Sequence, residues 1–205
     1  MRSTLAGRNH QAEKSRKTRE RVITSTVGLI RREGLLSASP SRITQHVGMS
    51  WGAVQHHFGS KEQLLKKIVL LSRDQFHEAV SVRDYSALSL VERISLFVDS
   101  AWQHYQGDVF LASVEITFWH RNNGQALSED IASDDGRTSH LTRAVIERVF
   151  EGTDAQTNKL IEATVYMHCV LTGLAFQKIL ASDRTPFLQH LAHCKDAMMK
   201  IVLGN

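Results

Sequence analysis

The sequence contains little cysteine and little proline, with two of each among 205 residues. The cysteines, Cys169 and Cys194, stand at no spacing typical of a metal or redox site, and both lie in apolar stretches with helical periodicity. Reduced, buried thiols in a cytoplasmic protein are the simplest interpretation. So few prolines are typical of a largely helical chain, because proline interrupts helices.

Long apolar runs are also absent. No run approaches the ~20 residues that a helix needs to cross a bilayer, so no membrane partner is expected. The N-terminal segment is basic but contains no apolar core of the ~7 residues that a signal peptide requires. The sequence shows no carboxylate pair, no nucleophile elbow and no phosphate-binding loop. It therefore predicts neither an enzyme nor a cofactor.

The charge is unevenly distributed along the chain. Residues 1–81 hold 14 basic and 6 acidic residues, a net charge of +8, while residues 82–205 hold 11 basic and 15 acidic ones, a net charge of −4. A basic front and an acidic rear indicate that the N-terminal part meets a polyanion. A solvated basic tail would give the same asymmetry, so this interpretation also needs an element that can read a groove.

Hydrophobic periodicity predicts an all-α fold of about nine helices, without the alternation typical of strands. Helix starts are marked by capping serines at positions 39, 50, 60 and 89, and glycines 34 and 48 mark an end and a turn. The expected elements are a polar arm over 1–17 and helices over 18–33, 40–47, 51–57, 61–80, 90–105, 108–119, 125–150, 157–182 and from 186 onward. The 157–182 helix is apolar over most of its circumference, which predicts burial on several sides.

Two short helices joined by a glycine turn form a helix-turn-helix, whose second helix enters the major groove of DNA. Five apolar residues are spaced to pack this pair on the 18–33 helix: Ile43, Val47, Met49, Val54 and Phe58. The residues left on or beside the exposed face of the second helix are Trp51, Ala53, Gln55, His56 and His57. The spacing therefore predicts a short probe with an apolar back and a polar front.

The residue types on this front suit contacts with bases and phosphates. Gln55 can pair with adenine through two hydrogen bonds, and the Ala53 methyl can touch the methyl group of thymine. Gly52 lets the backbone approach the duplex closely. Three further residues stand at helix starts, where free N–H groups also bind phosphate: Ser39, Ser50 and Lys61.

With these residues in place, the segment resembles the TetR family of bacterial one-component regulators. The resemblance covers roughly residues 18–68, about a quarter of the chain, followed by an all-helical remainder of appropriate size. It is carried by Glu33-Gly34, Ile43, Gly48, Ser50, Gly52, Val54, His57-Phe58, Ser60-Lys61-Glu62 and Leu64-Leu65. The continuation from the histidine and phenylalanine into a long helix makes it more specific than a helix-turn-helix alone.

The resemblance implies a cytoplasmic repressor that a small-molecule effector releases from a near-palindromic operator. It also implies a homodimer, built by two C-terminal helices of each subunit. Carried over by position, phosphate would be held by Ser39, His57 and Lys61, and bases would be read by Arg42, Ala53 and Gln55. We expect a flexible basic arm over 1–17, a DNA-binding domain over 18–60 and a ligand-binding and dimerisation domain over 61–205, with 61–80 as the connecting helix.

The same resemblance implies a ligand cavity and a dimer interface in the helical body. The residues expected to border the cavity are Trp102, Phe118, Met167 and His168. The residues expected at the dimer interface lie on the last two helices: Leu171, Leu174, Phe187, Leu191, Cys194, Met198 and Val202.

Two other functions stay open from the sequence. An activator of the same fold would have the same residues, because the sign of regulation depends on where the operator lies. A metal-responsive sensor would use the histidine-rich body, where His190, His193 and Cys194 have a spacing suited to zinc. No fourth ligand is evident nearby and an interface already explains that helix, so we assign no metal site.

Overall fold

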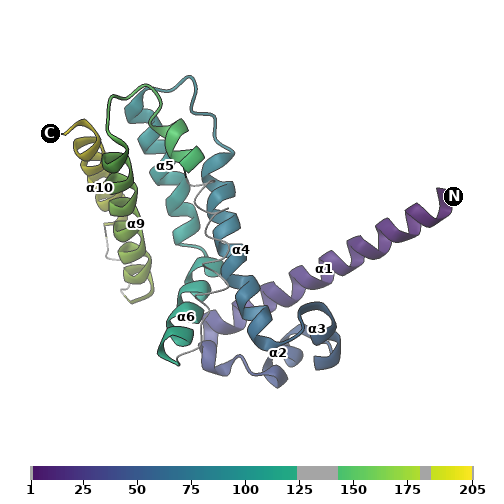
Figure 1. The fold of residues 1–205 in the computed structure, drawn as a ribbon. Coiled ribbons are helices and arrows are strands. Elements are labelled where there is room, and N and C mark those ends of the chain that lie inside the picture. Colours follow the sequence, from purple (N-terminus) through teal and green to yellow (C-terminus); the bar gives the residue numbers. More distant parts are fainter. Residues whose placement is uncertain (1, 124–142, 181–185, 205) are drawn as a thin grey trace. The chain divides into compact units, whose positions relative to one another are not determined.

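The computed structural model describes residues 2–123, 143–180 and 186–204, and every regular element among them is helical. The elements, drawn in Figure 1, are α1 (Arg2–Glu33), the 3-10 turn η1 (Leu35–Ser37), α2 (Pro40–Val47), α3 (Trp51–Phe58), α4 (Lys61–Ser81), α5 (Leu90–Tyr105), α6 (Asp108–Asn122), α9 (Thr157–Leu180) and α10 (Phe187–Leu203). Residues 143–149 are also helical. The all-α prediction is confirmed, while the helix predicted over 125–150 lies partly outside the described residues.

Local capping explains why α2 and α5 begin, and α2 ends, where the sequence predicted. The Ser39 hydroxyl accepts the N–H of Arg42 at 3.3 Å, and proline follows at the first helical position. Ser89 and Glu92 form a reciprocal capping box at the start of α5. Gly48 ends α2 in the left-handed conformation, with φ of 70°, which residues with a side chain rarely adopt.

α1 extends much further toward the N-terminus than predicted. The arm expected over 1–17 is helical from Arg2 onward, and in Figure 1 this part of α1 projects beyond α2 and α3. Ion pairs one turn apart stabilise the exposed helix, namely Glu13–Arg16, Glu13–Lys17 and Arg16–Glu20. The predicted arm is therefore corrected, since polar composition alone does not account for these pairs.

The chain forms two compact units whose limits differ from the predicted domains. The first unit holds residues up to Ser72 and α6 from Leu111 onward, and the second holds Arg73–Phe110 and the described residues from 143 on. The boundary expected after residue 60 stays a prediction; in the structure the first half of α4 buries apolar residues in the first unit. As a result, α4 and α6 each belong to both units.

The first unit is built around the C-terminal half of α1. This half packs against η1, α2 and α3. The side chains that it buries completely or almost so include Val22, Leu29 and Ile30, and α2 and α3 bury Ile43 and Val54. α6 contributes its own buried row: Ala112, Ile116 and His120. The helix-turn-helix therefore rests on a continuous apolar core.

The second unit is built around α5, α9 and α10, which pack on one another. Polar contacts at the edges join the same helices: Lys195 on α10 lies 2.8 Å from Asp99 on α5, and Lys178 on α9 donates to Gln106 at 2.7 Å. Arg148 donates to the backbone carbonyls of Ser81 and Arg83 at 2.9 and 2.8 Å.

The predicted dimer-interface stripe lies inside this second unit. Six of its seven members are at most 8% exposed, namely Leu171, Leu174, Leu191, Cys194, Met198 and Val202, and Phe187 is half-buried against the ring of Trp102. Side chains that one subunit already covers are not available to a second copy. The assignment of these residues to a dimer interface stays a prediction, because helical spacing identifies an apolar face but not which neighbour covers it.

The face of α9 that points away from this core is also rich in apolar residues. Exposed positions on it include Ile161, Val165, Tyr166, Ile179 and Leu180. The sequence had predicted that α9 is buried on several sides. Within one chain it is not, because this face of α9 is exposed. Among the described residues α9 is also the helix whose length and composition would allow it to cross a membrane, although core helices of soluble proteins meet the same test.

Met198 distinguishes a core residue from an interface residue. Met198→Ala removes a fully buried side chain, so the free energy of unfolding should fall by about 2–5 kcal/mol. Val82→Ala, at a position that is 75% exposed, should change it by less than about 0.5 kcal/mol. Chemical denaturation monitored by circular dichroism measures both. A stable, monomeric Met198→Ala variant would instead restore the interface assignment.

Candidate nucleic-acid interface

α3 is held by its inner side and capped at its start. Val54 on α3 is fully buried, as is Ile43 on α2, so both short helices are anchored to α1. The Ser50 hydroxyl accepts the N–H of Ala53 at 3.3 Å and fixes the first turn of α3. The α2–α3 connection is tight because Gly48 adopts a left-handed conformation.

The outer side of α3 carries the polar residues that the sequence placed there. Gln55, His56 and Gly52 are exposed, whereas Trp51, Ala53 and His57 are half-buried. A Cβ atom added at Gly52 would meet nothing within 4 Å, so no contact inside the subunit requires glycine at this position. The His56 and His57 rings meet edge to face, with centroids 5.4 Å apart. The surface is therefore open to another molecule along one side of the helix.

Arg42 is paired within the subunit. Its guanidinium forms an ion pair with Glu33, the last residue of α1, and donates to Gln45 at 3.1 Å. The hydrogen bond from Arg42 lowers the pKa of Glu33. His46 lies 3.9 Å from the same carboxylate. Sequence reasoning named Arg42 as a base reader but missed Glu33, which orients it; Glu33 precedes the α1-ending glycine, and that position alone did not indicate the pair.

Three residues were predicted to contact phosphate from helix starts, and all three lie at helix starts in the structure. The hydroxyls of Ser39 and Ser50 are engaged as N-caps of α2 and α3. Lys61 is the first residue of α4, directly after Ser60, whose hydroxyl accepts the N–H of Gln63 at 3.2 Å. Helix starts concentrate free N–H groups and partial positive charge, which suits a phosphate.

A groove in the first unit brings His57 together with basic residues of α1 and α4. Its volume is about 330 Å³. The residues that line it are Arg16, Arg19, Glu20, Ile23, His57, Phe58, Gln63 and Lys67. The predicted phosphate contact at His57 therefore lies beside three further basic side chains.

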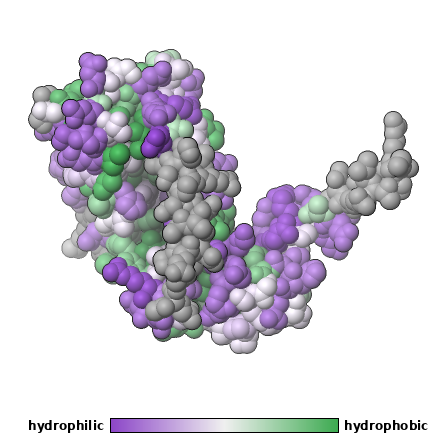
Figure 2. Space-filling view, viewed as in Figure 1, coloured by the Kyte–Doolittle hydropathy of each residue, from purple (hydrophilic) through white to green (hydrophobic). Residues whose placement is uncertain are grey.

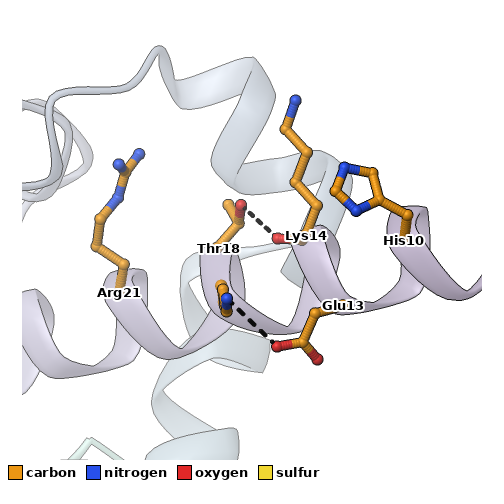
Figure 3. Close-up of a pocket in the computed structure, with 6 residues that line it drawn as sticks. His10, Glu13, Lys14, Thr18 and Arg21 are labelled. Carbon is orange, nitrogen blue, oxygen red and sulfur yellow. Dashed lines mark hydrogen bonds and ion pairs between the residues drawn. The ribbon is translucent and has the colours of Figure 1, made fainter.

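The exposed side of α1 adds a second set of basic residues. A hollow of about 430 Å³ is lined by His10, Glu13, Lys14, Lys17, Thr18 and Arg21. Figure 3 shows Lys14 and Arg21 on one side of the helix and Glu13 on the other, and the part of α1 visible in Figure 2 is mostly hydrophilic. The positive charge counted in the sequence is thus displayed on the surface of the first unit.

The second unit contains a hollow of about 290 Å³ at the end of α5. It is lined by Gln75, Ala79, Gln103, His104, Gly107, Asp108 and Val109. His104 joins this hollow to a cluster of rings, since its ring lies 5.7 Å from that of Phe76 and 5.4 Å from that of Phe110. The ring of Tyr105 belongs to the same cluster, with its centroid 4.6 Å from that of Phe110. The Tyr105 hydroxyl forms a hydrogen bond with Nδ1 of His168.

The four residues expected to border a ligand cavity are divided between the two units, and their role stays a prediction. Phe118 is 53% exposed and belongs to the first unit, while Trp102, Met167 and His168 belong to the second. Met167 is buried in the core, and Trp102 stacks on Phe187. His168 contacts the ring cluster through Tyr105. The residue type alone does not tell whether an aromatic side chain lies in the core, on the surface or beside a cavity.

A metal site finds no support among residues 2–123, 143–180 and 186–204. Within these ranges no three histidine, cysteine, aspartate or glutamate side chains gather as ligands. His190 and His193 are exposed with ring centroids 6.3 Å apart, whereas Cys194 is buried. Burial raises the pKa of the Cys194 thiol to about 11, which opposes the thiolate that a metal requires.

Comparison with known proteins agrees with this geometry. Residues 22–68 match the family model described as bacterial regulatory proteins, tetR family. The chain is 29% identical over 100 residues to the HTH-type transcriptional regulator BetI of Vibrio parahaemolyticus, which covers 48% of this chain and 50% of that protein. It is 26% identical over 149 residues to the HTH-type transcriptional regulator CymR of Pseudomonas putida, covering 71% and 69%. The chain thus spans about half the length of the BetI relatives that it matches.

Solved structures share the fold. A putative TetR-family transcriptional regulator from Mesorhizobium loti superposes with a TM-score of 0.70 at 14% identity, covering 92% of this chain and 96% of that one. The capped helix α3, anchored on its inner side and polar on its outer side, has the arrangement of a helix-turn-helix. Residues 22–68 thus match the tetR family of bacterial regulatory proteins, and the fold of the described residues is similar to that of solved TetR-family regulators.

His104 should make the stability of the second unit depend on pH. Burial, together with His77, lowers the pKa of His104 from its ordinary value of 6.5 to about 4. Between pH 6.5 and 4 the unfolded chain therefore binds a proton that the folded chain does not, so the free energy of unfolding should decrease as the pH falls. In His104→Gln this dependence should be shallower. Urea titrations from pH 7 to pH 4 measure the two slopes, and equal slopes would contradict the assignment.

Proposed function

We propose that the protein is a cytoplasmic, homodimeric repressor that leaves a near-palindromic operator when a small molecule binds. The observation that carries the proposal is the two-sidedness of α3. Its inner side is anchored through Val54, while Gln55, His56 and the open backbone at Gly52 face outward. A helix held in this way has the geometry needed to enter a major groove without rearranging.

Base reading would come from α3 and the start of α2. Gln55 would bond an adenine, and Ala53 would contact a thymine methyl group. Arg42 would read a neighbouring base from an orientation that Glu33 holds. Ser39, Ser50, Lys61 and the groove around His57 would bind the phosphates that frame this site.

Electrostatic attraction would support the same contact. The basic side of α1 and the groove around His57 present several cations per subunit to a polyanion. Each phosphate that a basic residue neutralises releases counterions, so affinity should decrease steeply with salt concentration. This contribution does not depend on base sequence and would steer the protein onto DNA.

Effector response would start at the hollow of the second unit. Gln75 and Ala79 on α4 and Asp108 and Val109 on α6 line it, and both helices continue into the first unit. A ligand there would favour one of two arrangements of these helices and could shift their balance only by its difference in affinity. Half-sites lie about 34 Å apart along DNA, so a modest change in probe separation would lose specific binding.

Dimerisation would use the outward face of α9. Its exposed apolar side chains, among them Ile161 and Val165, would gain burial only against a second chain. A second copy is the occupant that a two-fold operator requires, because the symmetry of a protein dimer matches the symmetry of its site. The interface would therefore lie on the side of α9 opposite to Leu171 and Leu174, the two α9 residues of the stripe predicted from the sequence.

The division between base readers and phosphate contacts can be tested with two alanine variants. Gln55→Ala should relax preference at one base pair, at a cost of about 1–3 kcal/mol for the preferred operator. Lys61→Ala should weaken binding to all duplexes alike and reduce the salt slope by about 1. Fluorescence anisotropy on a duplex selected from a random pool, and on single-base variants of it, measures both effects.

Two results would contradict the proposal at different levels. If the purified protein selected no duplex from the pool even at low salt, DNA-binding regulation would be excluded. If Gln55→Ala weakened all duplexes equally, as Lys61→Ala does, the protein would still bind DNA but the role of Gln55 would be wrong.

Cys169 offers a direct test of the dimer face. It lies on α9 one turn after Val165 and is exposed, whereas Cys194 is 1% exposed. Mild oxidation or a short bis-maleimide should therefore link two subunits through Cys169, seen as a covalent dimer on a non-reducing gel. Cys169→Ser should abolish the product and Cys194→Ser should retain it. A sedimentation-proven dimer that does not cross-link at Cys169 would place the interface elsewhere.

A further inference from the structure

The turn that joins α1 to α2 is capped from another helix. η1 begins after Gly34, which has no side chain to cap it and adopts a φ of 80°. The N–H of Leu35 instead donates to the Oε1 atom of Glu115 on α6, at 2.6 Å and in a part-buried position. A Cβ atom at Gly34 would lie 3.5 Å from the same oxygen. Glu115 therefore fits closely against the start of η1.

This turn determines where the helix-turn-helix begins. Leu35 is 3% exposed and Ala38 is fully buried, so both ends of η1 are fixed in the core. The next residue, Ser39, is the N-cap of α2. A shift of η1 would therefore move the first turn of α2, and with it the α3 helix that packs beside α2.

α6 provides a firm base for the Glu115 carboxylate. Ala112 and Ile116 are fully buried in the first unit. The buried hydroxyl of Ser113 donates to that of Ser72 on α4 at 3.2 Å. Because its neighbours on both sides are fixed, Glu115 presents its oxygen to η1 from a rigid helix.

We propose that Glu115 is a positioning residue for DNA recognition, which sets the position of the helix-turn-helix by capping η1 from α6. The inference rests on the proposed function and deepens it. The Glu115 oxygen supplies the acceptor that Gly34 lacks, and leaving the Leu35 N–H without it would loosen the turn. The residue acts through α2 and α3 and needs no contact with DNA.

The same helix connects this cap to the hollow of the second unit. Asp108 and Val109 line the hollow, and Glu115 follows two turns later on α6. A change at the start of α6 would therefore reach the cap on η1 along one helix.

Three substitutions at one position separate geometry from charge. Glu115→Ala removes the acceptor, Glu115→Asp keeps the charge but withdraws it by one methylene group, and Glu115→Gln keeps an acceptor oxygen at the original distance. Glu147→Ala, on an exposed residue of the second unit, removes the same charge elsewhere and serves as the control. The full chain is used, with an operator duplex selected from a random pool by the unaltered protein and a scrambled duplex of equal length.

Glu115→Ala and Glu115→Asp should lose between about two- and thirty-fold in affinity for the operator, while binding to the scrambled duplex stays unchanged. Glu115→Gln should retain most of the affinity, and Glu147→Ala all of it. Amide exchange over residues 35–43 should be faster in the first two variants. A purely structural role would instead lower both affinities in proportion to the folded fraction, which unfolding curves of each variant report.

Two outcomes would overturn the inference without touching the proposed function. In one, Glu115→Ala binds the operator as tightly as the unaltered protein. In the other, Glu115→Asp retains affinity while Glu115→Gln loses it, which would make the effect one of charge. If the unaltered protein bound the operator duplex no better than the scrambled duplex, the proposed function itself would be wrong. This result is distinct from the two outcomes above, in which the unaltered protein still prefers the operator.

Discussion

The first unit depends on the burial of the inner side of a very short helix. α3 has eight residues, too few to be stable alone, so its conformation comes from packing and from its caps. Val54 is fully buried, and this one contact leaves Gln55 and His56 on the other side of the helix. Rigidity and exposure of the probe therefore have the same cause.

Polar contacts then adjust what packing alone leaves free. Apolar contacts hold α2 and α3 against α1 but tolerate small rotations, whereas hydrogen bonds and ion pairs have preferred directions. Glu33 orients the Arg42 guanidinium, and Glu115 holds η1. Both carboxylates lie outside α2 and α3, so the geometry of the probe is specified by residues that would never touch a base.

Much of the fold was predictable because its signals are local. Helix starts follow from capping serines and from Pro40, and the buried positions of α2 and α3 follow from helical spacing. What the sequence left undetermined involves residues distant in the chain. Glu115 and Leu35 are 80 positions apart, and no periodicity relates them. Likewise, an apolar stripe shows that Met198 is covered, but only the structure shows that its own subunit covers it.

The open backbone at Gly52 has a consequence for how this protein tolerates change. A glycine inside a helix lowers the stability of that helix by about 0.5–1 kcal/mol relative to alanine. At Gly52 a methyl group would contact no atom within 4 Å. Folding would thus accept, and even favour, a larger residue here. If related proteins keep glycine at this position, the reason would be the close approach of the bound macromolecule and not the stability of the protein.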